Sequence, residues 1–110
     1  MSMSYYQLHF FVPSYALEAV KGAIFSAGGG TLGAYTHCCW QTQGSGQFMP
    51  NTGANPAIGS VGMLTQVDEW YVLVLCAESS LQSAILALKA AHPYEEPAYG
   101  VTRILMEADL

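Results

Sequence analysis

Glu-Trp-Tyr-Val-Leu-Val-Leu-Cys, at residues 69–76, sets the architecture of this chain. Scarcely a polar side chain interrupts it, which is typical of a central strand covered on both faces. Ser79 and Ser80 then offer N-caps for a helix, which Pro93 ends because proline cannot continue it. The buried stripe of that helix is predicted to contain Leu81, Ala84, Ile85 and Leu88.

The segments before and after these residues also show the periodicity of strands and helices. Residues 5–12 alternate, with Tyr6, Leu8, Phe10 and Val12 on one face of a strand and Tyr5, Gln7, His9 and Phe11 on the other. The remaining predicted elements are a helix at 14–27 ended by glycines, a strand at 35–43 and a last strand at 99–106. The order βαββαβ predicts an α+β fold, a ferredoxin-like sandwich: a four-stranded antiparallel sheet with both helices on one face.

Composition limits the classes of function. A chain of 110 residues fits a single domain, 1–110, and 52% hydrophobic residues argue against disorder. A formal net charge of −5 without a basic cluster makes nucleic acid a poor partner. The longest apolar run, 70–77, is too short for a membrane helix, so we expect no membrane and a cytoplasmic location. Three cysteines do not make a disulfide framework.

The face of the sheet without helices raises a packing problem. Tyr5, Phe11 and alternate residues of 70–76 are predicted to lie there. Burying apolar area contributes about 25 cal/mol per Å², so wet side chains on this face forfeit several kcal/mol. We therefore expect a homo-oligomer, either a dimer or a trimer, and expect the subunit junction to shape whatever cavity the protein uses.

Two motifs have a structural interpretation as well as a functional one. Gly28-Gly29-Gly30-Thr31-Leu32-Gly33 matches G-x-G-x-x-G, but it follows a helix, which favours a C-cap and a tight turn over a phosphate cradle. In the strand predicted at 35–43, alternation sends Cys38 and Trp40 to one face and His37 and Cys39 to the other. Cys38 is expected to be buried, whereas His37 and Cys39 are candidate metal ligands facing a neighbouring subunit.

The densest polar signal is His92-Pro93-Tyr94-Glu95-Glu96-Pro97-Ala98-Tyr99. An imidazole and two carboxylates within a proline-stiffened loop suit a divalent metal ion, with His92, Glu95 and Glu96 as ligands. The alternative is structural: a helix dipole favours His92, and the carboxylates are simply solvated. The glycine-rich segment 44–62 is predicted to be a long loop at the same end of the sheet, so a pocket is expected there.

These residues together resemble a known family. The matching motifs are Gly28-x-Gly30-x-x-Gly33-x-Tyr35-x-His37-Cys38-Cys39-Trp40, Gly44-x-Gly46-x-Phe48-x-Pro50, Asn55-Pro56-x-Ile58-Gly59, Glu69-Trp70 and Ala90-Ala91-His92-Pro93-Tyr94-Glu95-Glu96-Pro97-Ala98-Tyr99. They are similar to stand-alone YqfO-type proteins and to the small domain inserted in the Ngg-interacting-factor-like family, whose larger members are called type 2 GTP cyclohydrolase homologues.

The resemblance implies a fold like the PII and CutA proteins, which are commonly trimeric and bind small ligands or metal ions near subunit clefts. It implies that segment 44–62 is a regulatory arm. It also implies that the dinuclear metal site and any hydrolase chemistry of the larger members lie in a flanking domain. The resemblance leads us to expect an acidic residue at position 100, where this chain has Gly100.

Three functions remain open at this point. The favoured one is a non-enzymatic oligomeric binding or regulatory module, which holds a divalent metal ion or a small ligand near loop 92–99. Gly44, Gly46, Phe48 and Tyr94 are its expected ligand-binding residues. The alternatives are a small metal-dependent hydrolase with Glu95 or Glu96 as general base, and a protein-interaction domain without a small ligand.

Overall fold

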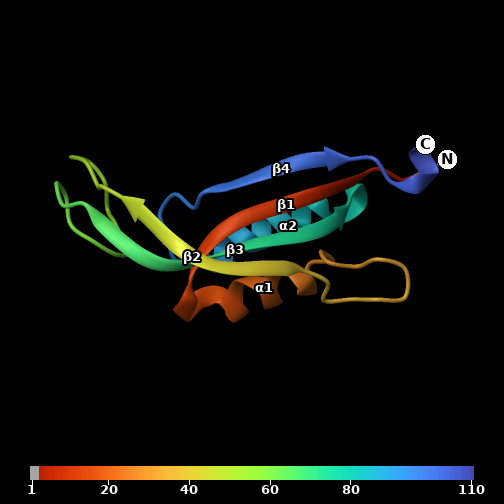
Figure 1. Ribbon diagram of the computed structural model, residues 1–110, viewed down its shortest axis with the longest axis horizontal. Coiled ribbons are helices and arrows are strands. Elements are labelled where there is room, and N and C mark those ends of the chain that lie inside the picture. Colours follow the sequence, from red (N-terminus) through yellow and green to blue (C-terminus); the bar gives the residue numbers. More distant parts are fainter. Residues whose placement is uncertain (1–2) are drawn as a thin grey trace.

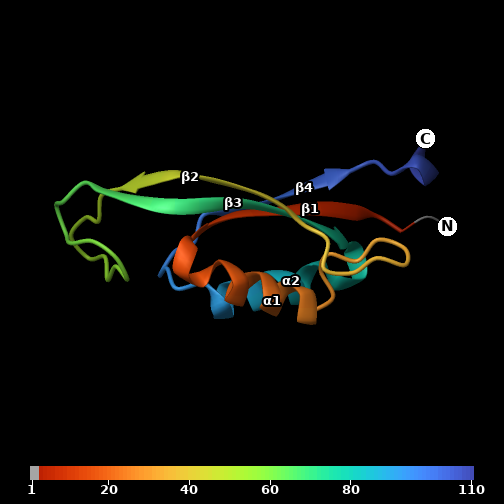
Figure 2. The same ribbon diagram turned by 60° about the horizontal axis from the view of Figure 1, so that its bottom comes forward.

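The computed structural model describes residues 3–110. Its elements in chain order are β1 (Tyr5–Pro13), the 3₁₀ turn η1 (Ser14–Ala16), α1 (Leu17–Ser26), β2 (Trp40–Phe48), β3 (Thr65–Ala77), α2 (Glu78–Ala91), β4 (Tyr99–Ile104) and the 3₁₀ turn η2 (Glu107–Asp109). The strands form one sheet in the order β2-β3-β1-β4 with antiparallel pairing throughout, and α1 and α2 cover one face (Figures 1 and 2). The predicted ferredoxin-like βαββαβ sandwich is confirmed.

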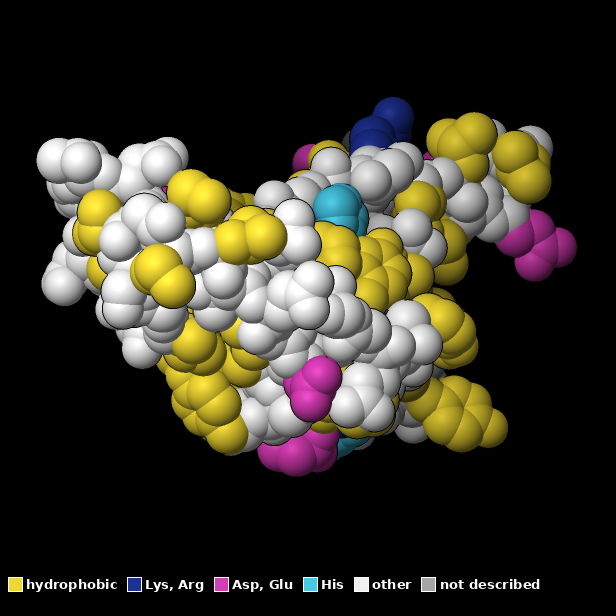
Figure 3. All heavy atoms as spheres, turned by 60° about the vertical axis from the view of Figure 1, so that its left-hand side comes forward, with side chains coloured by type: hydrophobic (Ala, Val, Ile, Leu, Met, Phe, Trp, Pro, Cys, Tyr) yellow, Lys and Arg dark blue, Asp and Glu magenta, His cyan; other side chains and the backbone are white. Residues whose placement is uncertain are grey.

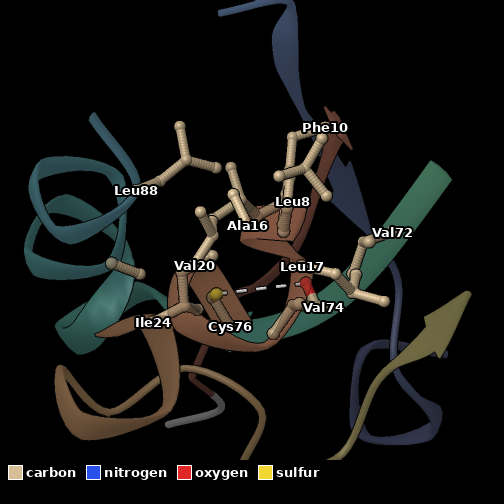
Figure 4. Packing of buried hydrophobic residues seen from close by; sticks show 12 residues of the cluster. Leu8, Phe10, Ala16, Leu17, Val20, Ile24, Val72, Val74, Cys76 and Leu88 are labelled. Atoms are coloured by element: carbon tan, nitrogen blue, oxygen red, sulfur yellow. Dashed lines mark hydrogen bonds between the residues drawn. The ribbon is translucent and has the colours of Figure 1, made fainter. Parts of the chain in front are cut away.

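The core lies between the sheet and the two helices. Alternation along β1 buries Leu8, Phe10 and Val12 completely, opposite residues of β3 that point the same way. Figure 4 shows Leu8 and Phe10 in the same buried cluster as Val20 and Ile24 of α1. The fully buried side chains that complete the core are Val72, Val74, Cys76, Ala84 and Leu88. Because one face of each element is apolar, this layer holds both helices on the sheet.

Among residues 3–110, no helix or strand covers the other face of the sheet (Figure 2). Phe11 is 41% exposed there, and its ring lies 5.1 Å from that of Tyr71. Leu73 and Leu75 on the same side of β3 are half-buried. The prediction that residues 69–76 are covered on both faces is therefore wrong for the single subunit, where the helices cover one face. We call this side of the sheet the open face.

The second strand differs from its prediction. It spans Trp40–Phe48, not 35–43, so residues 44–48 belong to a strand and the long loop begins only after Phe48. Polar residues make a strand here because each pairs with β3, in a register that joins Trp40 to Leu73 and Phe48 to Thr65. The ends of β2 and β3, together with loop 49–64, extend beyond the helices as an arm (Figure 2).

The glycine run after α1 is a helix terminus, as its context indicates. Gly28 has φ 102°, and its N–H donates to the Phe25 carbonyl, while the Gly29 N–H donates to the Ile24 carbonyl. These two bonds define a Schellman cap. Gly30, with φ 75°, then turns the chain across the end of β3, where its N–H donates to the Leu75 carbonyl.

Residues 35–39 form a loop, which overturns the alternation expected for them. His37 has φ 59°, outside the strand region, and is exposed. Cys38 and Cys39 are both half-buried, so the expectation that Cys38 is a buried strand residue is wrong. The Cys38 N–H donates to the Gly30 carbonyl, which ties this loop to the helix terminus.

No helix among residues 3–110 is both long enough and apolar enough to cross a membrane.

Candidate functional site

A pocket of about 950 Å³ lies where the arm meets the loop that follows α2. One wall is formed by residues 42–54 and 56–58, from β2 and the loop that follows it. Tyr94, Glu95 and Glu96 form the facing wall. Phe11 and Tyr71 of the open face lie between them. Segments 44–62 and 92–99, which are expected to meet at this end of the sheet, thus line one cavity. Its lining includes the four expected ligand-binding residues, Gly44, Gly46, Phe48 and Tyr94.

Glu69 is the central polar residue of this pocket. Its side chain lies on β3, and the residue is only 9% exposed. One carboxylate oxygen, Oε2, accepts a hydrogen bond of 2.7 Å from the Tyr94 hydroxyl. The other, Oε1, lies against Gly46, at a point where any Cβ would overlap it. Gly46 is therefore glycine because the Glu69 carboxylate occupies the space of a side chain.

Tyr94 connects the loop to both strands of the arm. Its ring lies 6.1 Å from the ring of Phe48 and 4.9 Å from that of His92. Burial and the bond to Glu69 raise the pKa of the Tyr94 hydroxyl well above its ordinary value. The hydroxyl therefore stays protonated at neutral pH and acts as a fixed donor to the carboxylate.

His92 has a structural role, not the expected metal-binding one. Its residue is 6% exposed, and Nε2 lies 2.7 Å from the Phe11 carbonyl, to which it donates. The Tyr94 N–H donates to Nδ1 at 3.1 Å. Burial lowers the pKa of the imidazole, and the neutral ring satisfies both bonds. Both nitrogens are thus committed to backbone groups, which leaves no lone pair for a metal ion.

Glu95 and Glu96 are exposed at the rim of the pocket. Glu95 Oε1 accepts a 3.1 Å hydrogen bond from the backbone N–H of Asn55, which joins the loop to the arm. This bond connects the proline-stiffened loop with the glycine-rich one across 40 residues of sequence. It is the kind of contact that sequence spacing does not reveal.

His37 and Cys39 lie at the opposite end of the sheet. Their loop is bonded through Gly30 to Leu75, which is six residues along β3 from Glu69, about 20 Å of strand. The structure therefore does not bring His37 and Cys39 together with His92, Glu95 and Glu96. Within residues 3–110 of one subunit, no group of three or more His, Cys, Asp or Glu side chains is arranged to hold a metal ion. The five expected ligands are not one metal centre in the single subunit.

The charged side chains that line the pocket are all acidic. Glu69, Glu95 and Glu96 line it, whereas none of its lining residues is Lys, Arg or His. The surface of the arm in Figure 3 is mostly uncharged with isolated hydrophobic side chains, and the dark blue side chain in that view lies beyond it. The pocket therefore favours positive charge and opposes anions.

A local contact also explains why residue 100 is glycine. His9 of β1 lies beside it on the open face, and a Cβ at Gly100 would come within 2.6 Å of two atoms of that ring. A side chain at position 100, acidic or otherwise, does not fit while the imidazole is there. Glycine at position 100, where the resemblance leads us to expect an acidic residue, leaves room for the His9 ring.

Solved structures define the class of fold. CutA from Xylella fastidiosa superposes with a TM-score of 0.65 at 15% identity, covering 93% of this chain and 85% of its own. The GlnK–ATP complex of B. subtilis has a TM-score of 0.63 at 8% identity, covering 94% of this chain and 84% of its own. At such identities these proteins share the fold alone, and the fold class is PII- and CutA-like.

Sequence comparison makes the relationship more specific. The GTP cyclohydrolase 1 type 2 homolog of Mycobacterium bovis is 46% identical over 91 residues, 83% of this chain and 24% of the relative. A Bacillus cereus protein related to NIF3 has a TM-score of 0.81 at 33% identity, covering 94% of this chain and 26% of its own. No model of a known protein family matches the chain. The recognised resemblance is confirmed: the chain is homologous to one segment of the NIF3-related proteins, and it spans about a quarter of their length.

Proposed function

We propose that this chain is a non-enzymatic, oligomeric binding or regulatory module whose ligand occupies the pocket between the arm and loop 92–98. The observation that carries the proposal is Glu69, a residue only 9% exposed whose carboxylate lies between Gly46 and the Tyr94 hydroxyl. Burying a carboxylate is costly unless something compensates its charge, and a bound ligand is one way to do so. Gly44 and Phe48 complete the wall against which such a ligand would lie.

The state of the polar groups favours binding over catalysis. General base chemistry needs a side chain that can accept a proton from the reacting group. Both nitrogens of His92 are bonded to the backbone, and the raised pKa of Tyr94 keeps its hydroxyl protonated. An enzyme here would have to use one of the three pocket carboxylates.

The proposal is tested by comparing two glycines on the same strand. Gly46→Ala places a Cβ where Glu69 Oε1 lies, whereas Gly44→Ala finds open space. Native mass spectrometry of freshly purified protein should show a retained small molecule on the wild type and on Gly44→Ala, with less on Gly46→Ala. Equal occupancy on all three would place the ligand elsewhere, and an absence of retained molecules on the wild type would count against a tight-binding module.

Assembly is the second part of the proposal. The half-buried Leu73 and the exposed Phe11 and Trp40, at 41% and 61%, leave apolar area on the open face that a second copy would cover. That face continues into the pocket through Phe11 and Tyr71, so a neighbouring subunit would border the site.

Light scattering tests the assembly. Wild type at micromolar concentration should be a dimer or trimer, and Leu73→Glu should be a monomer because it places charge on the open face. Leu86→Glu, on the outer side of α2 where Leu86 is 61% exposed, is the matched control and should leave the assembly intact. A monomeric wild type would contradict this part of the proposal.

A divalent metal ion is the alternative ligand. The name of one structural neighbour, from Ehrlichia chaffeensis, is divalent ion tolerance protein CutA1. Glu95 and Glu96 are exposed at the rim, and a metal ion held there would need ligands from a second subunit. Calorimetric titration of zinc, copper and manganese into wild type and into Glu96→Gln tests it: heat that the variant loses supports metal binding, and silence across the series removes it.

A further inference from the structure

We infer that the ligand of this pocket is a small organic ammonium ion: a positively charged nitrogen on a compact apolar body. The inference rests on the proposed function and makes it more specific. It combines the charge of the pocket, the open acceptor of Glu69 and the aromatic rings beside it.

Glu69 provides the anionic anchor. Its Oε2 is bonded to Tyr94, but Oε1 has no hydrogen-bond partner among residues 3–110. No buried side-chain oxygen or nitrogen in that part of the chain lacks a partner, so Oε1 must retain access to solvent. A carboxylate oxygen without a protein partner, on a residue that is otherwise largely buried, binds an N⁺–H donor more strongly than a surface carboxylate does.

Aromatic rings surround this anchor in two pairs. Phe11 and Tyr71 lie 5.1 Å apart on the open face, and Phe48 and Tyr94 lie 6.1 Å apart across the two walls. All four line the pocket. The faces of such rings carry partial negative charge and attract organic cations, while their carbon surface packs against an apolar body.

The same features make other ligand classes fit less well. An anion would meet the carboxylates of Glu69, Glu95 and Glu96, with no basic side chain among the lining residues to offset them. A bare metal ion would need several hard ligands close together, and no group of three exists within residues 3–110. An organic ammonium ion needs only one carboxylate and the ring faces.

Paired probes separate charge from shape. Benzylamine and benzyl alcohol are similar in size, as are choline and 3,3-dimethylbutan-1-ol, but the first of each pair is a cation. Calorimetry on the whole protein should show at least one cation binding about tenfold more tightly than its neutral counterpart. Its affinity should fall as salt increases, because screening weakens the attraction.

Three variants locate the binding. Glu69→Gln keeps the shape of the side chain and removes its charge, so it should lower the cation's affinity about tenfold and leave the neutral counterpart unchanged. Phe48→Leu, which keeps an apolar wall without a ring, should also weaken the cation. Glu107→Gln, in η2 at the far end of the chain, is the control and should have no effect. Circular dichroism checks that each variant is folded.

Each outcome decides something. Equal binding of cation and neutral counterpart, no binding of either cation, or an unchanged affinity in both Glu69→Gln and Phe48→Leu overturns the ammonium inference. If a neutral or anionic molecule is instead retained on the purified protein in a Gly46-dependent way, the binding module stands and only its ligand class is wrong. If no retained molecule is sensitive to Gly46→Ala, the proposed function fails as well.

Discussion

The body of this molecule, which consists of the two helices and the part of the sheet that they cover, is stabilised differently from the arm. In the body, β1, β3 and the two helices bury a set of purely apolar side chains, including Phe10, Val20 and Val74 at 0% exposure. The arm continues from β2, which reads Trp-Gln-Thr-Gln-Gly-Ser-Gly-Gln-Phe. This strand is largely exposed, and its order comes from pairing with β3. Stability therefore resides in the body, whereas the pocket lies between the arm and the loop that follows α2. The difference shows how one sheet can carry a well-packed core at one end and a largely exposed polar strand at the other.

The largest effect should come from breaking the body while sparing the arm. Phe10→Ala removes a fully buried ring and should lower the free energy of unfolding by about 3–5 kcal/mol. Phe48→Ala, in the half-exposed wall of the pocket, should cost about 1 kcal/mol or less, because little packing is lost there. Urea unfolding followed by circular dichroism measures both. Equal losses would mean that the arm is part of the core.

Two glycines with positive φ make the same comparison at the level of the backbone. Gly30 (φ 75°) has the Cys38 carbonyl 2.8 Å from where a Cβ would be, whereas Gly53 (φ 100°) in the arm loop has open space. Gly30→Ala should destabilise by about 2–3 kcal/mol, from strain and a backbone clash, and Gly53→Ala by about 1 kcal/mol from strain alone. Thermal unfolding of the two variants distinguishes them. A larger loss in Gly53→Ala would contradict the separation of the two regions.

His92 joins the two regions, and its titration gives a pH dependence. Burial lowers its pKa in the folded state, so the unfolded chain binds the proton more readily. The contribution to stability is complete above the ordinary pKa of about 6.5 and is lost as the pH falls below it, with a slope of at most about 1.4 kcal/mol per pH unit. Unfolding midpoints measured from pH 7.5 to 5.5 should therefore decline.

Replacing the imidazole should flatten that decline. His92→Gln cannot take up the proton, so its stability, lower overall, should vary less across the same range. His37→Gln is the control, because His37 is exposed at the other end of the sheet, and it should keep the wild-type slope. A slope that persists in His92→Gln would show that a different group is responsible.

The smallest expected effect is a gain in the body. Gly22 lies in α1, exposed, with nothing within 4 Å of the position of a Cβ. Gly22→Ala should stabilise the protein by about 0.5–1 kcal/mol, since alanine loses less conformational freedom in a helix. The unfolding midpoint should rise without a change in ligand affinity. A shift in affinity would show that the body and the pocket are energetically coupled.

The sequence predicted the body well because its signals are local. Alternation at residues 5–12 and helical spacing around Val20 and Leu88 follow directly from the periods of strand and helix. The second strand was misplaced because Gln41–Gln47 has no apolar alternation, and only its register with β3 makes it a strand. Residues 35–39 look like strand by composition, but His37 at φ 59° places them in a turn.

The sequence predicted where the pocket lies but not which side chains form its polar centre. The two loops could be assigned to one end of the sheet from topology, and six of the expected residues line the cavity. The sequence indicates no binding role for Glu69, because a carboxylate beside an apolar strand is typical of a strand end. Its role depends on the missing side chain of Gly46 and on the Tyr94 hydroxyl, and neither contact follows from sequence spacing.

The two tryptophans give the core and the open face separate optical signals. Trp70 follows Glu69 in β3, and its indole packs against the core. The indole Nε1 donates a 3.1 Å hydrogen bond to Ser14 Oγ. Trp40 is 61% exposed on the open face. Emission from the first should lie at shorter wavelength and be hard to quench with iodide, whereas the second should be red-shifted and quenched readily until another subunit shields it. Fluorescence of the unlabelled protein can therefore separate assembly from unfolding.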